Sequence, residues 1–353
     1  MTNASDSRRF VHMSKQEFSI PKLAQRLQTE ADAYLMLEEL RWGGAPEACP
    51  KCGGMGRCHY LAPKNGSDRA TRTGKRSQRR VWFCGHCRKQ FSVLTDTIFH
   101  GTRIGLRTWL LVIFDFCSAK NSMSAWEVSR KYEITNESAW HMLHRIREAM
   151  KREPLAGLFT GTVQADETFV GGEPKNRHRN DPREPNRPYA TSDKTAVFSI
   201  VNYETREARS RVVADVTGRT LLPAIQEQTD TTRTMLHTDA AKAYRVAAPY
   251  MLRHEFVSHA QGEYVRDGVS TNLCEGFFSQ TKRSIDGSHH HVSTEHLHRY
   301  LAQFDFLYTH CRRTDSERLR TLIGRVDGRR LTYARLIEDG PIRESRAVVE
   351  GCM

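Results

Sequence analysis

Two pairs of cysteines with the spacing C-x2-C constrain the fold of this 353-residue chain more than any other feature. One pair stands in "CPKCGG" and the other in "FCGHCRKQF". Each pair is followed by a turn-forming glycine or a basic residue, which is typical of the two knuckles of a tetrahedral zinc site. Four free thiols would not explain the paired spacing. The sequence therefore predicts one structural Zn2+ held by Cys49, Cys52, Cys84 and Cys87. The alternatives for one ligand are Cys58, His59 and His86.

A strongly basic stretch, 64–80, lies between the knuckles and contains seven Lys or Arg residues and one Asp. A hairpin tip with this charge suits contacts with phosphates, and a solvated loop is the alternative. The whole chain carries a formal net charge of +13, which commonly accompanies a polyanionic partner such as nucleic acid. The candidate DNA-contacting residues of this stretch are Arg72, Lys75, Arg76, Arg79 and Arg80.

The apolar runs and the cysteine count bear on the cellular compartment. The longest apolar run, 109–114, is too short to span a bilayer. The first residues contain no apolar core of a signal peptide. Nine cysteines, an odd number, argue against a disulfide framework. We therefore expect an intracellular, cytoplasmic protein without a membrane partner.

Helical patterns fill two parts of the chain. Residues 14–42 are expected to be helical, and Gly43, Gly44 and Pro46 end that segment. Residues 105–152 follow a helical pattern throughout and divide at "EIT", where Thr135 is the expected N-cap. A short helix, a tight turn and a longer basic helix suit a helix-turn-helix DNA reader, although an ordinary helical pair is the alternative. The residues expected to face a groove are Asn136, Ser138, His141 and Arg145.

A strand-rich region follows Pro154 and Gly157. Short β-branched runs bounded by turns read as strands, and the tight turn between the second and third predicts a hairpin. The order is three strands, then helix, strand, helix, strand, helix, which indicates a mixed α/β layer. Between the first two strands, 173–194 reads as a mobile loop. The expected strands are 162–172, 195–204, 208–216, 234–240 and 254–260.

These patterns predict a multidomain α+β protein. Its expected parts are an N-terminal helical segment at 14–45, a zinc ribbon at 46–100, a helical, helix-turn-helix-like DNA-binding domain at 101–153, an α/β catalytic domain with a mixed sheet at 160–312 and a C-terminal tail at 313–353.

Two aspartates and a glutamate form a candidate acidic site. Asp166 and Asp239 each stand where an apolar strand is expected to end, and Glu275 lies on a later helix. One such aspartate would ordinarily be a turn or cap residue. Three carboxylates brought together would repel one another unless divalent cations neutralise them. Hard oxygen ligands select Mg2+ or Mn2+, and two such ions can cleave or join a phosphodiester. Glu167 should point to the other face of its strand.

The stretch "TNLCEGFFSQTKRS", 271–284, is expected to be an amphipathic helix. Its polar stripe carries Asn272, Glu275, Ser279 and Lys282. A salt bridge between Glu275 and Lys282 is disfavoured, because they are seven residues apart rather than four. The apolar side, expected to pack on the sheet, carries Leu273, Cys274, Phe277, Phe278, Thr281 and Ile285.

Several motifs together resemble the zinc-ribbon DDE transposases of bacterial insertion sequences. The motifs are "CPKCGG", "FCGHCRKQFSVLTDTIFHGTRIGLRTWL", "ADETFVGGEPKNRH", "HTDAAKAY", "NLCEGFFSQTKR" and "HHHVSTEHLHRYL". The resemblance runs from about residue 20 to about 312 and implies an RNase H-like catalytic core. It places the catalytic acids at Asp166, Asp239 and Glu275, and a downstream basic residue at Lys282, with Arg283 beside it. Asn272 is a competing third ligand, since some relatives have Asn there.

The chain departs from the family pattern at two positions. Phe278 stands where Trp is common, and Cys274 stands where a small or aliphatic residue is usual. Neither change removes a ligand.

The resulting hypothesis is a nucleoid-associated transposase that binds terminal inverted repeats and target DNA. Two Mg2+ ions would support strand cleavage and strand transfer, and synapsis of two ends implies a homo-oligomer. The alternatives are a DNA-binding regulator with an inactive core and a Mg2+-dependent nuclease that cuts without joining.

Overall fold

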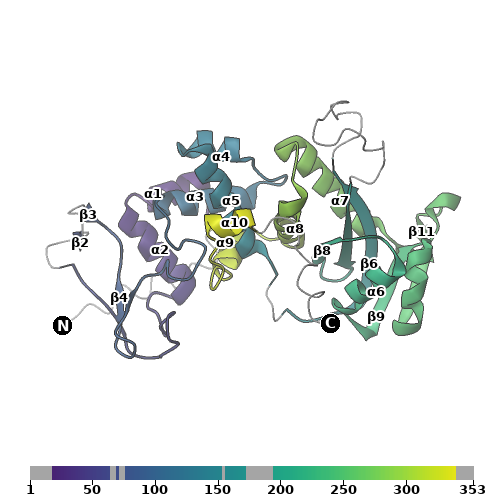
Figure 1. Ribbon diagram of the computed structural model, residues 1–353, viewed down its shortest axis with the longest axis horizontal. Helices are drawn as coiled ribbons and strands as arrows, with labels where there is room; N and C mark the ends of the chain where they lie inside the picture. The colour runs from purple at the N-terminus through teal and green to yellow at the C-terminus, as the bar shows by residue number, and fades with distance from the viewer. Residues whose placement is uncertain (1–17, 64–68, 71–75, 153–155, 172–193, 339–353) are drawn as a thin grey trace, which may run out of the picture. The chain divides into compact units, whose positions relative to one another are not determined.

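A computed structural model describes residues 18–63, 69–70, 76–152, 156–171 and 194–338 (Figure 1). The chain forms two compact units. The first comprises Met1–Ala119, Val128–Ile134 and Arg312–Arg330, and the second comprises Lys120–Glu127, Thr135–Cys311 and Leu331–Met353. None of the helices in the described part of the chain has the length and apolar character needed to cross a membrane. The expected mobile loop at 173–194 lies outside the described residues except for Lys194.

Two short helices replace the single helical segment expected at 14–42. They are α1 (Ile20–Arg26) and α2 (Glu30–Trp42). The break falls at Thr29, because Thr29 and Asp32 form a capping box that begins α2. Gly43 ends α2 with a φ of 67°, a left-handed conformation that glycine adopts readily. The expected stop was therefore correct, and the expected continuity was wrong.

The zinc-ribbon segment forms a small antiparallel sheet in the first unit. The strand order is β1-β4-β5, with β1 (Cys58–Tyr60), β4 (Trp82–Cys84) and β5 (Gln90–Phe91). Separately, β2 (Arg69–Ala70) pairs antiparallel with β3 (Arg76–Ser77). The sheet packs around a cluster of Cys49, Trp82, Cys84 and Phe91, against which Trp42 of α2 also packs.

The helical stretch 105–152 forms three helices that divide between the two units. They are α3 (Leu106–Ser118), α4 (Ala125–Tyr132) and α5 (Asn136–Met150). The hydroxyl of Thr135 accepts a hydrogen bond from the Ser138 amide, as its prediction as N-cap requires. The residues of α4 from Val128 onward belong to the first unit, and α5 belongs to the second.

The segment expected to be a C-terminal tail contains ordered helices. Helix α9 (Asp315–Ile323) belongs to the first unit, and α10 (Tyr333–Glu338) belongs to the second. The Phe18 amide donates to the Ser316 hydroxyl at 2.6 Å, and the Arg318 guanidinium donates to the Cys117 carbonyl at 3.1 Å. Residues nearly 300 positions apart therefore meet in the first unit.

A five-stranded mixed sheet forms the centre of the second unit (Figure 1). Its strand order is β10-β9-β6-β7-β8, in which β6, β7 and β8 are antiparallel and β6, β9 and β10 are parallel. The β7–β8 hairpin and the order of elements confirm the sequence prediction. The strands are β6 (Phe159–Val170), β7 (Thr195–Asn202), β8 (Ala208–Val213), β9 (Thr229–Asp239) and β10 (Arg253–Val257).

Each face of this sheet is covered by its own apolar cluster. On one face, Val163, Ala165 and Leu236 pack with residues of α6 (Gly218–Gln226) and of the 3-10 helix η4 (Lys242–Tyr250). On the other face, Val197 and Val201 pack with residues of α7 (Asn272–Ser284) and α8 (Thr294–Thr309). The apolar side predicted for 271–284 therefore does pack on the sheet.

Short elements connect β10 to α7 and α7 to α8. The 3-10 turn η5 (His259–Gln261) leads into a hairpin of β11 (Val265–Arg266) and β12 (Val269–Ser270). A π-helical turn, η6 (Ile285–His289), follows α7.

Candidate metal centres and nucleic-acid interface

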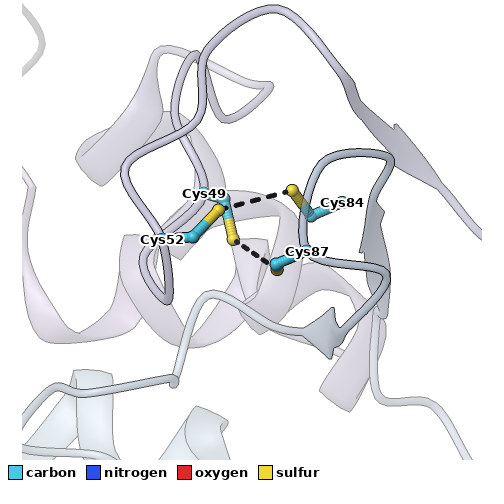
Figure 2. Close-up of side chains that lie close together, drawn as sticks. All are labelled: Cys49, Cys52, Cys84 and Cys87. Carbon is cyan, nitrogen blue, oxygen red and sulfur yellow. Dashed lines mark hydrogen bonds between the residues drawn. The ribbon is translucent and has the colours of Figure 1, made fainter.

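Four cysteine side chains from the two knuckles point toward one another (Figure 2). The sulfurs of Cys49 and Cys87 are 3.8 Å apart, as are those of Cys52 and Cys84. All four lie within 4.8 Å of one another. Zinc–sulfur bonds of about 2.3 Å in a tetrahedron place the sulfurs about 3.8 Å apart, so the geometry fits zinc.

Backbone amides of the second knuckle favour the thiolate of Cys84, whereas burial raises the pKa of the Cys49 thiol. The amides of Cys87 and His86 donate to the Cys84 sulfur and lower its pKa to about 6. The Lys51 amide donates to the Cys49 sulfur at 3.4 Å. Thiolate is the form that binds metal. The His86 imidazole, considered as an alternative ligand, lies instead 3.1 Å from the Met55 carbonyl.

The register of the large sheet brings two aspartates to the same level. Strands β6 and β9 pair in parallel up to Gln164 and His237, and Asp166 and Asp239 each stand two residues further on. Asp166 does not end its strand as expected, because β6 continues to Val170 through its pairing with β7. The parallel pairing with β9 ends before Asp166, so no β9 residue is paired with Asp166 on the edge of β6 that faces Asp239. Asp239 is the last residue of β9, as predicted.

Glu275 comes from the first turn of α7, whose start is fixed by a buried glutamine. The Gln164 side chain accepts a hydrogen bond from the Leu273 amide at 2.8 Å and donates to the Ser270 hydroxyl at 3.1 Å. The Cys274 thiol also donates to the Gln164 carbonyl at 3.2 Å. Because Gln164 and Asp166 share a face of β6, the helix start lies on the Asp166 side of the sheet.

Electrostatic interactions connect the three carboxylates. Burial raises the pKa of Asp166 to about 7 together with the negative charges of Glu167, Asp239 and Glu275, against the lowering effect of the amide hydrogen bond from Glu167. The Glu167 carboxylate itself accepts from the Tyr244 hydroxyl, within the cluster on the opposite face. The expected orientation of Glu167 is thus confirmed. Unlike the cysteines, these acids do not place their oxygens all within 4.8 Å of one another in the described part of the chain.

Two residues lie beside Glu275 in contacts that the sequence does not predict, although His259 itself is a candidate DNA contact from its place at the end of a strand. His259 Nε2 is 3.4 Å from Glu275 Oε1, and the Thr271 hydroxyl is 3.2 Å from that imidazole nitrogen and 3.4 Å from the same carboxylate oxygen. The side chain of Glu275 is 42% exposed. Nothing in the spacing of His259 indicates this contact, because it depends on how the chain folds back after β10.

The polar stripe of α7 is open to solvent. Asn272 and Lys282 are exposed. The Arg283 side chain is also exposed and donates to the Ser279 carbonyl at 3.2 Å. Lys282 and Arg283 are therefore accessible to a phosphate, while Asn272 and Glu275 lie one helical turn apart as predicted.

The other predicted DNA-contacting residues lie in different environments. Arg72 and Lys75 are outside the described residues, and only the backbone of Arg76 is described, in β3. Arg79 is exposed and donates to the Ser92 hydroxyl at 3.0 Å. Arg80 forms a 2.7 Å ion pair with buried Glu38, which also accepts from the Trp82 indole at 2.8 Å. Arg80 thus has a structural partner.

Two of the four predicted groove residues on α5, His141 and Arg145, are not equally accessible. His141 is half-buried, and burial lowers its pKa. Arg145 is only 5% exposed, which leaves little surface for DNA in the conformation described. The DNA contacts of both residues stay predictions, and burial opposes that of Arg145.

Comparison with protein-family models gives two matches. Residues 158–309 match an ISXO2-like transposase domain, and residues 28–90 match a transposase zinc-ribbon domain. The first match contains Asp166, Asp239 and Glu275, and the second contains all four cysteines of the zinc cluster.

Individual proteins also match the chain. A solved structure, the simian T-cell lymphotropic virus intasome in complex with PP2A regulatory subunit B56 gamma, is 14% identical over 54% of this chain and 66% of that chain, but its TM-score of 0.26 is too low to indicate a shared fold. An uncharacterized protein in transposable element ISH50 of Halobacterium salinarum is 25% identical over 84% of this chain and 96% of its own length. Since that organism is an archaeon, a bacterial source is not confirmed. The two domain matches and this relative together support an insertion-sequence transposase.

Proposed function

We propose that the chain binds the terminal inverted repeats of an insertion sequence and catalyses Mg2+-dependent strand cleavage and strand transfer. The observation that carries this proposal is the register of β6 and β9, in which Asp166 and Asp239 each follow the last parallel pair by two residues, with Gln164 of β6 bonded to the start of α7, the helix that carries Glu275. The strand order, with three antiparallel strands followed by two parallel ones, supports an RNase H-like core. The transposase-domain match over 158–309 supports the same interpretation.

Asp166, Asp239 and Glu275 would hold two Mg2+ ions. Carboxylate oxygens are the ligands that Mg2+ prefers, and a buried carboxyl with a raised pKa is the group that gains most from a neighbouring cation. When bound, the ions would polarise the scissile phosphodiester and activate the attacking water or 3′-hydroxyl. Lys282 would contact a phosphate near the scissile bond, and the zinc ribbon would bind the element ends.

The proposed active site is tested by substituting each acid in turn. Asp166→Ala, Asp239→Ala and Glu275→Ala should each abolish Mg2+-dependent cleavage of DNA carrying the flanking inverted repeats, because each removes a metal ligand. Binding to the same DNA should persist. The measurement is gel-resolved cleavage alongside a binding titration, with Glu227→Gln, an exposed glutamate at the end of α6, as the control.

Retained cleavage in any one of these variants removes that residue from the site. If Glu275→Ala cleaves and Asn272→Ala does not, Asn272 is the third ligand. A nuclease that cuts without joining is separated from a transposase by scoring strand-transfer products on a second, supercoiled DNA.

A further inference from the structure

An exposed aromatic side chain lies next to the proposed active site. The Tyr264 side chain, at the start of the β11–β12 hairpin, is 56% exposed. Its ring stacks on that of His259, with centroids 5.1 Å apart and planes 27° apart. His259 Nε2 in turn lies 3.4 Å from Glu275 Oε1. The His259 side chain therefore lies between Tyr264 and Glu275, a proposed metal ligand.

The segment that carries these rings is held in place by hydrogen bonds. The Glu263 amide donates to the Ser258 carbonyl at 3.1 Å and closes the turn before Tyr264. The Arg266 guanidinium donates to the Phe256 carbonyl at 2.7 Å, which ties the hairpin to β10, and it lies 3.3 Å from the Glu263 carboxylate. A ligand that uses Tyr264 therefore meets a surface that is already ordered, which lowers the entropy cost of binding.

Exposure alone does not distinguish Tyr264, because single exposed apolar side chains are common. Tyr250 of η4 is 54% exposed and makes no ring contact with another described residue. Tyr264 differs in having one face backed by an imidazole and in its proximity to Glu275. Substitution of Tyr250 is therefore a matched control for substitution of Tyr264.

We propose that Tyr264, backed by His259, is a stacking platform for an unpaired nucleobase beside the scissile phosphodiester. This proposal rests on the proposed function. A phosphate held at the three carboxylates would be joined to its base through one sugar, which brings the base near the ring. An aromatic side chain can stack on any unpaired base, because every base has a π-face.

The first test uses a sequence-independent probe. A single-stranded oligothymidylate with one 5-iodouracil should crosslink to Tyr264 under ultraviolet light, more strongly than the same strand paired with oligoadenylate. Tyr264→Ala should lose this crosslink and bind the single strand about tenfold more weakly, whereas Tyr264→Phe should bind like the wild type. Tyr250→Ala should behave as the wild type does. Unchanged binding in Tyr264→Ala, or a crosslink that maps elsewhere, would overturn the platform.

A second test separates the platform from the proposed function. Abasic sites are placed one by one at the nucleotides flanking the cleavage point of the element end. At one position, Tyr264→Ala should slow cleavage about tenfold on intact DNA and have no effect on the abasic DNA, because the base and the ring act as a pair. Equal losses on every abasic substrate would exclude stacking. A protein that crosslinks at Tyr264 but cleaves no DNA would retain the platform and refute the transposase.

Discussion

At the scale of single residues, Asp166 combines burial with like charges from neighbouring acids. Its pKa of about 7 in the folded chain compares with an ordinary value of 3.8. The folded protein therefore holds a proton on Asp166 between about pH 4 and pH 7, where the unfolded chain has released it. Stability without Mg2+ should fall as the pH rises through this range, since the folded state binds the extra proton.

Replacement of Asp166 by Asn should remove this pH-dependent penalty. Above pH 7 the Asp166→Asn variant should be more stable than the wild type, by at most about 4 kcal/mol, and the difference should disappear toward pH 4. Urea unfolding in Mg2+-free buffer at several pH values measures the difference. A constant difference between the two proteins across pH 4 to 8 would contradict the raised pKa.

The second prediction for a single residue concerns Arg80, because its guanidinium pairs with the buried carboxylate of Glu38. Glu38 is 1% exposed and its pKa is raised by burial. Arg80→Ala should destabilise the first unit by about 2 to 4 kcal/mol, since it leaves Glu38 without its cation. Thermal unfolding provides the measurement.

Arg79→Ala is the matched control for Arg80, because the adjacent arginine is exposed and its guanidinium donates to an uncharged partner, the Ser92 hydroxyl. It should change stability by less than about 1 kcal/mol. If Arg80→Ala unfolds like the wild type but loses DNA binding, the original interpretation of Arg80 as a DNA contact is the better one.

At the scale of elements, the shortness of the zinc-ribbon strands makes the metal a main source of their stability. Strands β1, β4 and β5 are two or three residues long, and a sheet of such strands depends on its cross-link. The purified protein should contain about one zinc per chain. Cys84→Ser should lose it, whereas Cys311→Ser, which changes an exposed cysteine outside the cluster, should retain it. Elemental analysis measures the zinc content of each protein. A wild-type protein without zinc would contradict the assignment of the four cysteines as a zinc site.

The elements also indicate where sequence reasoning succeeds. The C-x2-C spacing specifies the zinc knuckles because both ligands of each pair are close in the chain. The helical spacing of the apolar residues in 271–284 specifies the buried side of α7. Cys274, Phe277 and Phe278 are buried as predicted. The break between α1 and α2 was missed, because the capping box of Thr29 and Asp32 competes locally with an otherwise continuous apolar pattern.

The contacts that sequence reasoning missed are tertiary. Gln164 lies in a strand more than 100 residues before the helix that it caps, and no periodicity relates the two. His259 reaches Glu275 only because η5 turns the chain back after β10. The three acids are candidates from the sequence and the family resemblance, whereas the contact of Gln164 with the start of α7 and that of His259 with Glu275 appear only in the folded chain.

At the scale of the whole molecule, the first unit is assembled from both ends of the chain. Helix α9 buries Leu319, Leu322 and Ile323, and Val326 follows it in the same unit. Full burial of such side chains contributes roughly 1.5 to 3 kcal/mol each, which together is comparable to the total stability of a small domain. The ribbon-bearing unit therefore depends on residues that the sequence interpretation treated as a tail.

Two truncations test this dependence. Removing 313–353 deletes α9 and should abolish the cooperative unfolding of the first unit, because its core loses four buried side chains. Removing 331–353 deletes only α10 and the residues that follow, so the first unit should unfold as in the full chain. Hydrogen exchange, followed by mass spectrometry of peptides from α1 to α3, reports on that unit alone. Equal protection of these peptides in the two truncated proteins would mean that α9 does not stabilise the first unit.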